Sequence, residues 1–247
     1  MKKIKFFGAY VMLLFLFISC SDDEKEIIIS CNTLSGTVKI MPLGASRVQG
    51  FRPVFESYRY ALWEELIDGD WRVDYVGTQQ DVTKYENYAG YCFDNDHEGR
   101  SGWTSEQIKN NIADWLVEVD EIDIVLFSSP GGNDAIDGVP IEDILQNVNP
   151  IIDEIQMHNP NITILIEKMA PAKSSYMTEN LTAVFEQMKI EVDEFARIKT
   201  TATSKVIAVD MFTGFKDDFL IDDLHYNLEG ARFIAGRYYE SLAPFLQ

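Results

Sequence analysis

The chain has 247 residues, of which 46% are hydrophobic and 25% charged, and this is enough to bury the core of one α/β domain. Acidic residues number 40 against 21 basic ones, and the formal net charge is −19. A surface this negative repels nucleic acids and anionic membrane surfaces, so we expect neither as a partner, whereas neutral sugars and acyl esters stay compatible with it.

The first 19 residues have the pattern of a signal peptide. Lysines at positions 2, 3 and 5 precede an apolar stretch over 6–19 that is too short to span a bilayer. The stretch ends in LFISC, which predicts that Cys20 is the lipidated cysteine of a bacterial lipoprotein. An ordinary secretory signal that happens to end beside a cysteine is the alternative. Cleavage before Cys20 leaves 18 basic and 40 acidic residues, a net charge of −22.

The segment SDDEKE that follows Cys20 is too acidic to pack into a core. It resembles the export signals of lipoproteins displayed on the outer face of some Gram-negative cells, and a plain solvated linker is the other reading. We therefore predict a signal peptide over 1–19, a lipidated cysteine and tether over 20–30, and one folded domain over 31–247. The expected location is the outer membrane, facing the cell surface or the periplasm, with the N-terminal lipid as the only membrane attachment.

Two further cysteines, Cys31 and Cys92, belong to the predicted domain. In an oxidising compartment they either pair with each other or stay as two isolated buried thiols, and their spacing does not decide between these alternatives. The sequence has no group of His and Cys residues with the spacing of metal ligands. We therefore expect neither a metal nor an organic cofactor.

Along the domain, short apolar segments alternate with helical patterns. Segments that are nearly continuously apolar predict strands buried on both faces of a parallel sheet, over 37–44, 71–78, 122–129, 162–170 and 205–211. Apolar residues at helical spacing predict helices between them, over 55–69, 104–119, 140–158, 178–195 and 231–242. This alternation predicts an α/β fold: a three-layer αβα sandwich around a flavodoxin-like, five-stranded parallel sheet.

Three details of the helices are also predicted. Thr104 and Gln107 have the spacing of a capping box at the start of the second helix. Pro150 divides the segment 140–158 into two helices, with Asn149 capping the second. The long helix over 178–195 begins near Thr178.

The segment KIMPLGASRVQG, over 39–50, leads from the first predicted strand into Ser46. Ligands of open parallel sheets bind beyond the carboxyl ends of the strands, so Ser46 lies where a nucleophile is useful. The nucleophile elbow of α/β hydrolases is excluded, because that motif needs glycine two residues after the serine, and Val48 stands there.

The chain has only three histidines that could serve as the base for this serine. His158 ends a helical pattern, a favourable place for a structural cation. His97 lies in a polar loop, where it could pack or bind. His225 follows the last strand, and Asp222 precedes it by three residues, so the carboxylate can hold the imidazole in a turn. We therefore select His225 as the base and Asp222 as its partner.

Donors for a developing oxyanion are found after two other strands. Gly102, in the loop after the second predicted strand, can present a backbone N–H without obstruction, and Asn133, after the third, offers a side-chain amide. Together with the backbone N–H of Ser46 they form the predicted oxyanion hole.

One serine, one glycine, one asparagine and one histidine, each after a different strand, resemble the blocks of the SGNH (GDSL-type) hydrolases. PLGAS matches their first block at Ser46, SGWT the second at Gly102, GGND the third at Asn133, and DDLHYN the last at Asp222 and His225. The segments SYRYALWEEL, DHEGRSGWT and HYNLEGARFIA further resemble carbohydrate esterase family 3, the acetylxylan esterases. Ala45 departs from the pattern, because the first block normally has aspartate there.

The resemblance implies a serine esterase that removes acetyl groups from an O-acetylated polysaccharide such as xylan, through an acetyl-enzyme and without a cofactor. Arg59, Arg100 and Trp103 are candidates for a sugar-binding surface; Tyr58, within an apolar stripe, is assigned to the core, and Arg59 could also brace the serine loop. The alternatives are an SGNH lipase or arylesterase and, because of Ala45, a catalytically silent glycan-binding surface lipoprotein. A nucleotide-binding domain is disfavoured, since no glycine-rich phosphate loop follows the first strand.

Overall fold

The computed structural model describes Asn32, residues 38–119 and residues 121–246, all within one unit, Cys31–Gln247. The predicted signal peptide, the lipidated Cys20, the acidic tether and Cys31 lie outside the described residues. Cys92 is disulfide-bonded.

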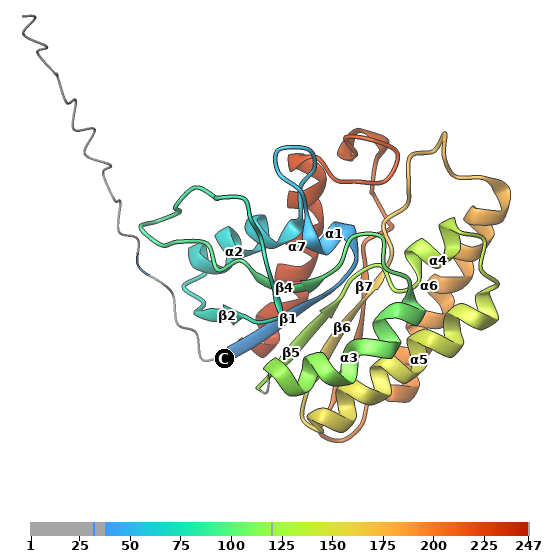
Figure 1. Ribbon diagram of the computed structural model, residues 1–247, viewed down its shortest axis with the longest axis horizontal. Coiled ribbons are helices and arrows are strands. Elements are labelled where there is room, and N and C mark those ends of the chain that lie inside the picture. The colour runs from blue at the N-terminus through green and yellow to red at the C-terminus, as the bar shows by residue number, and fades with distance from the viewer. Residues whose placement is uncertain (1–31, 33–37, 120, 247) are drawn as a thin grey trace, which may run out of the picture. The chain divides into compact units, whose positions relative to one another are not determined.

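The centre of the fold is a mostly parallel sheet of seven strands within the described residues (Figure 1). The strands are β1 Val38–Gly44, β2 Val73–Tyr75, β3 Gln79–Gln80, β4 Asp96–Gly99, β5 Ile124–Phe127, β6 Thr163–Lys168 and β7 Lys205–Asp210. Their order is β3-β4-β1-β5-β6-β7, and β2 also pairs with β1. Only β3 and β4 run antiparallel to each other.

Helices cover both faces of this sheet and complete three layers. They are α1 Ser46–Gln49, α2 Tyr58–Asp68, α3 Ser105–Val119, α4 Gly132–Ile136, α5 Ile141–His158, α6 Glu179–Lys199 and α7 Leu228–Leu242, with 3₁₀ turns at Asp217–Phe219 and Ala243–Phe245. Helices α2 and α7 cover one face, and α3, α5 and α6 cover the other (Figure 1).

Alternate strand residues supply the two cores, because successive side chains point to opposite faces of a sheet. Met41 and Leu43 pack with α3, α5 and α6, whereas Ile40, the residue before Met41, packs with α2 and α7. The predicted three-layer α/β sandwich is therefore confirmed.

The predicted count of five strands is wrong, because the sheet also contains β3 and β4. Strand β4 has the sequence DHEG, and its last three residues are buried although none of them has an apolar side chain. Apolar periodicity gives no signal for such a strand. Its place beside the end of β1, in the register Gly44 with Gly99, depends on tertiary contacts.

The division of residues 140–158 into two helices is also wrong: α5 runs unbroken through Pro150. Pro150 is exposed, so water can reach the Gln146 carbonyl, the acceptor of the missing i→i−4 bond. On the other side of α5, the side chains of Ile144, Val148, Ile151, Ile152 and Ile155 are buried and hold the helix together.

The other helix details are confirmed. The Thr104 N–H donates to Gln107 Oε1 at 2.9 Å, the reciprocal bond of a capping box, and the Leu181 N–H donates to the Thr178 hydroxyl at the start of α6. Among the described helices none combines the length and apolarity needed to cross a bilayer.

Candidate active site

Ser46 is the first residue of α1, directly after the carboxyl end of β1. Its Oγ lies 3.1 Å from Nε2 of His225, and Nδ1 of the same imidazole lies 2.8 Å from Oδ2 of Asp222. Because the carboxylate faces Nδ1, the proton of a neutral imidazole belongs on Nδ1, which leaves Nε2 to accept from the serine hydroxyl. The fold thus brings together three residues that the sequence predicted as a set.

The segment from Asp222 to His225 forms a local turn. Asp222 Oδ1 accepts from the backbone N–H groups of Leu224 at 2.8 Å and His225 at 2.7 Å, while Oδ2 holds the imidazole. Partial burial alone would raise the pKa of Asp222, but the hydrogen bonds from His225 and Leu224 outweigh it and lower that pKa. The carboxylate therefore stays ionised while it orients the ring.

Arg47, next to Ser46, connects α1 to the loops that carry the other site residues. Its guanidinium donates to the carbonyl oxygens of Leu224 at 3.0 Å, Ala170 at 2.6 Å and Pro171 at 3.1 Å. Leu224 immediately precedes His225, so this side chain fixes the distance between serine and imidazole. Sequence reasoning missed Arg47, because an arginine that binds carbonyl groups of distant loops leaves no local pattern.

A phenylalanine covers one face of the imidazole. The Phe55 ring stacks on His225 with 4.0 Å between centroids and 18° between planes. The Glu56 N–H donates to the Tyr226 carbonyl at 2.9 Å and joins the two segments. Phe51 contacts Phe55 and is 57% exposed, so aromatic surface extends from the histidine toward solvent.

Asn133 lies in the first turn of α4, after a turn with strained backbone. Ser129 has φ 48°, and Gly131 has φ 74°, a conformation that favours glycine. One N–H of the Asn133 amide donates to the Trp103 carbonyl at 2.8 Å, and the buried Glu167 accepts from the Ser129 N–H at 2.8 Å. These bonds hold the Asn133 side chain in place, and Asn133 and Ser46 line the same pocket.

Gly102 lies in the loop beside the serine loop. The Arg100 N–H donates to the Gly44 carbonyl at 3.0 Å, and the Ser101 N–H donates to Gln49 Oε1 at 2.7 Å. Gly102 itself is exposed, has φ 78° and does not line the pocket at Ser46. Within the described part of the chain its N–H donates to no other group, so it is free to approach a bound oxyanion.

The pocket at Ser46 is small and mostly apolar. Its volume is about 40 Å³; at about 10–15 Å³ for each water, this is room for roughly three water-sized groups. The apolar residues of its wall are Ala45, Ile136, Met169, Ala172, Phe185 and Leu224. Such a space is suited to a short acyl group.

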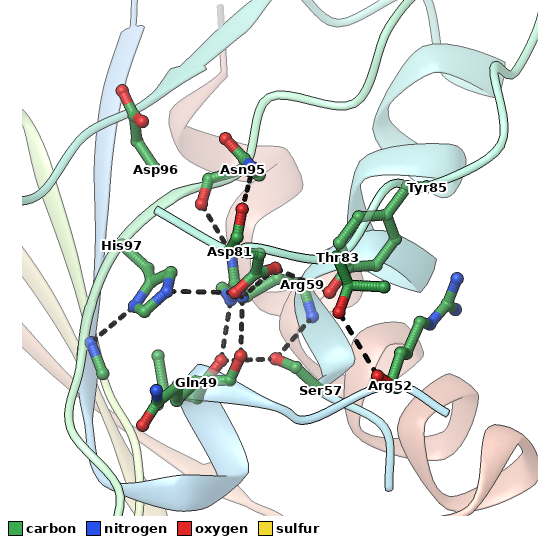
Figure 2. Close-up of polar contacts among 12 residues, drawn as sticks. Gln49, Arg52, Ser57, Arg59, Asp81, Thr83, Tyr85, Asn95, Asp96 and His97 are labelled. Atoms are coloured by element: carbon green, nitrogen blue, oxygen red, sulfur yellow. Dashed lines mark hydrogen bonds and ion pairs between the residues drawn. The ribbon is translucent and has the colours of Figure 1, made fainter. Parts of the chain in front are cut away.

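The three predicted sugar-binding side chains all have contacts within the fold. Arg59 is fully buried and cannot touch a substrate, and Figure 2 shows it within a polar cluster instead. Arg100 pairs with the buried Glu98 at 2.7 Å and lies over the Trp115 ring, and Trp103 packs partly buried against Trp115. The assignment of Arg59 to a sugar-binding surface is therefore wrong, whereas Arg100 and Trp103 are partly exposed and their assignment stays a prediction; Tyr58 is in the core, as expected.

His97 is buried in the same cluster as Arg59, which decides between the two readings of this residue in favour of packing. The described residues contain no group of three or more His, Cys, Asp or Glu side chains arranged to hold a metal ion.

Solved structures of esterases resemble most of this chain. A serine-to-alanine mutant of an acetyl esterase, with an acetate ion, is 29% identical with a TM-score of 0.73, and the match covers 85% of this chain and 98% of that one. A carbohydrate esterase family 3 protein from Talaromyces cellulolyticus is 30% identical with a TM-score of 0.72 and the same coverage. The family 3 carbohydrate esterase of Clostridium thermocellum is 28% identical, with a TM-score of 0.68 and coverage of 85% and 96%.

No family model matches the chain, and a comparison with curated proteins finds no match either. The match to the family 3 structure from Talaromyces cellulolyticus nevertheless reaches 30% identity and covers nearly the full length of that chain. The chain therefore belongs to the SGNH hydrolase superfamily, in carbohydrate esterase family 3, and is a carboxylic ester hydrolase.

Proposed function

We propose that this protein removes acetyl or other short acyl groups from an O-acetylated polysaccharide such as xylan. The observation that carries the proposal is the hydrogen-bonded series Asp222, His225, Ser46, which ends at a small apolar pocket beside Asn133. Family 3 carbohydrate esterases and an acetyl esterase among the similar structures support an acetyl ester as the substrate.

In the first half of the reaction, His225 Nε2 takes the hydroxyl proton of Ser46 while Oγ attacks the ester carbonyl carbon. The developing oxyanion is met by the backbone N–H groups of Ser46 and Gly102 and by the second N–H of the Asn133 amide. Asp222 stabilises the imidazolium that forms. The tetrahedral intermediate then collapses, its C–O bond to the alcohol breaks, and His225 gives its proton to the leaving oxygen.

In the second half, His225 takes a proton from water, and the resulting nucleophile attacks the acyl carbon of the acyl-enzyme. Collapse of this second intermediate releases the carboxylic acid, and the proton returns to Ser46 Oγ. No metal or organic cofactor takes part in these steps.

The size of the acyl group follows from the pocket. An acetyl group that enters it would place its methyl group against the apolar wall formed by Ile136, Met169 and Phe185. The small size of the pocket favours a short acyl group over the long acyl chain that the SGNH lipase alternative requires.

The alcohol side of the ester lies next to His225, because this residue must protonate the leaving oxygen. Phe55 stacks on that imidazole, and the exposed Phe51 continues the aromatic surface. The apolar CH face of a sugar ring packs well on an aromatic ring. We therefore assign the sugar to Phe51 and Phe55, in place of the buried Arg59.

The test is acetate release from acetylated xylan by the purified protein and by its Ser46→Ala variant. Release by the wild type that disappears in the variant supports the proposal. Cleavage of a small activated acetate ester, without release from acetylated polysaccharides, retains the serine esterase and rejects the carbohydrate substrate. If neither ester is cleaved, the glycan-binding alternative takes its place, and Ala45 becomes the residue to examine.

We also propose that the protein is anchored by lipid on Cys20 after removal of residues 1–19, at the cell surface or facing the periplasm. In cells that express the full chain, the protein should be found in the outer-membrane fraction, and a Cys20→Ser variant should leave that fraction. Retention of the variant in the membrane would contradict the anchor, and protease added to intact cells would distinguish the two faces.

A further inference from the structure

Helix α1 carries Ser46 but has little to hold it in place by itself. It has four residues, and its N-cap is Ala45, which offers no side-chain hydrogen bond. A helix this short leaves most of its terminal N–H and C=O groups without partners inside the helix. The position of the Ser46 hydroxyl therefore depends on what binds α1 from outside.

At its C-terminal end α1 is bound by a buried arginine from α2. Arg59 is 0% exposed; its Nε donates to the Val48 carbonyl at 2.7 Å, and its Nη2 donates to the Gln49 carbonyl at 2.8 Å. The Ser57 hydroxyl also donates to the Val48 carbonyl, at 2.7 Å. A cation at the C-terminal end of a helix complements both the free carbonyl groups and the helix dipole (Figure 2).

The charge of Arg59 is balanced by Asp81, from a loop more than 20 residues farther along the chain. Both carboxylate oxygens of Asp81 accept from Arg59 Nη2, at 2.8 and 2.7 Å, and Oδ2 also accepts from the Tyr85 hydroxyl at 2.6 Å (Figure 2). Burial would raise the pKa of Asp81, but the hydrogen bond from His97 and the charge of Arg59 lower it overall.

His97, on β4, completes the cluster and connects it to the sheet. Its Nε2 lies 3.1 Å from Asp81 Oδ1, and its Nδ1 accepts from the Gly99 N–H at 2.9 Å, so the ring is neutral with its proton on Nε2. Gly99 pairs with Gly44 of β1, and a Cβ at Gly99 would lie 2.5 Å from the Gln49 nitrogen. The cluster thus contacts α1 at its end and connects it to the strand that flanks β1.

We propose that Arg59 and Asp81 are positioning residues for the nucleophile. They fix α1 through the carbonyl groups of Val48 and Gln49 and so keep the Ser46 hydroxyl within hydrogen-bond distance of His225. Neither residue touches the substrate. This inference rests on the proposed role of Ser46 as the nucleophile. Since a displacement of about 1 Å at a reacting group can lower a rate about 10²-fold, loss of the pair is expected to act on kcat.

The test compares Asp81→Asn and Tyr85→Phe with the wild type. Asp81→Asn keeps the shape of the side chain but removes its charge, whereas Tyr85→Phe removes only one hydrogen bond to Asp81 and is the milder change. Tyr88→Phe is the matched control, because the Tyr88 hydroxyl also donates to a carboxylate, that of Asp68, away from α1. Three quantities are measured: kcat and KM on a small activated acetate ester, the rate of labelling of Ser46 by a fluorophosphonate, and the melting temperature.

We expect kcat and the labelling rate to fall about 10- to 100-fold in Asp81→Asn and several-fold in Tyr85→Phe, with KM changed less than about twofold. Tyr88→Phe should stay within about twofold of the wild type in both rates. If Asp81→Asn does not fold, Tyr85→Phe decides the question.

Folded Tyr85→Phe and Asp81→Asn proteins with lower melting temperatures but unchanged kcat and labelling would overturn the inference, and the pair would then be purely structural. A wild-type protein that neither cleaves the ester nor reacts with the fluorophosphonate would instead contradict the proposed function. The two failures are therefore distinguishable.

Discussion

Two aspartate–histidine pairs among the described residues look alike in isolation. Asp222 faces His225 at 2.8 Å, and Asp81 faces His97 at 3.1 Å. The first pair is open to solvent, with Asp222 51% exposed, whereas the second is enclosed, with His97 only 2% exposed. Each carboxylate fixes the tautomer of its imidazole, so the pairing alone does not distinguish a reactive histidine from a structural one.

The other ring nitrogen makes the difference. In His225 it faces the Ser46 hydroxyl, a group that can give up a proton, beside a pocket that a substrate can enter. In His97 it accepts from the Gly99 backbone N–H, which cannot take part in proton transfer. Burial, followed by the nearby Arg59, lowers the pKa of His97 to about 4, so this ring stays neutral at physiological pH.

The largest effect should come from exchanging the two histidines for glutamine, one at a time. His225→Gln is expected to lower kcat by about 10⁴-fold or more, because the general base is lost. His97→Gln should lower it by no more than about tenfold, since Gln can still donate to Asp81. Both values come from steady-state hydrolysis of a small activated acetate ester. Similar losses in the two variants would contradict the division between a reactive pair and a structural pair.

The next effect concerns the oxyanion that forms when Ser46, activated by His225, attacks the ester. Asn133→Ala should lower kcat about 10²- to 10³-fold with little change in KM, because its amide donates to charge that develops in the transition state. Asn111→Ala, which removes an exposed amide on α3 bonded to the Gln107 carbonyl, is the control and should be neutral. A loss of less than about threefold in Asn133→Ala would remove Asn133 from the oxyanion hole.

Within the buried pair, His97 should reveal itself mainly through the stability of the folded protein. The unfolded chain protonates His97 near its usual pKa of 6.5, whereas the folded protein does so only near 4. Between these values the unfolded state binds more protons, so the contribution of His97 to stability, up to about 3 kcal/mol, is present above pH 6.5 and is lost as the pH falls toward 4. Urea unfolding from pH 4.5 to 7.5 measures it.

The wild-type curve alone does not isolate this contribution. Burial raises the pKa of Asp94 from 3.8 to about 7, so its contribution has the opposite sign and is lost as the pH rises through 7. The difference between wild type and His97→Gln is the informative quantity, and it should shrink as the pH is lowered. A difference that does not vary with pH would show that His97 keeps an ordinary pKa.

The smallest effect concerns the exposed aromatic surface beside the Asp222–His225 pair. Phe51→Ala should raise KM for acetylated xylan about three- to tenfold and leave the hydrolysis of ethyl acetate, which has no sugar ring, within about twofold. Phe51→Tyr should behave like the wild type. Val82→Ala, at a side chain that is 95% exposed, is the control for surface change. Equal losses on both esters would mean that Phe51 supports His225 through Phe55 and does not contact sugar.

Much of the site was predictable because its signals are local. The turn Asp222–His225, the serine after β1 and the asparagine after β5 each follow a buried strand, and the carboxyl ends of parallel strands meet at one edge of the sheet. The capping box at Thr104 and the cap at Thr178 are likewise contained within a few residues. Such features need no knowledge of distant contacts.

The α/β class, the order of the main elements and the candidates Ser46, Asp222, His225 and Asn133 could be predicted from the amino-acid sequence, since apolar periodicity and short motifs encode them directly. Three features became clear only from the folded chain: Arg59 is buried against the end of α1 instead of lying on a sugar-binding surface, the polar segment DHEG forms a strand, and α5 passes through Pro150. The physical reason is the same in each case: partners distant in sequence, such as Asp81 for Arg59, supply the hydrogen bonds and burial that the local sequence lacks.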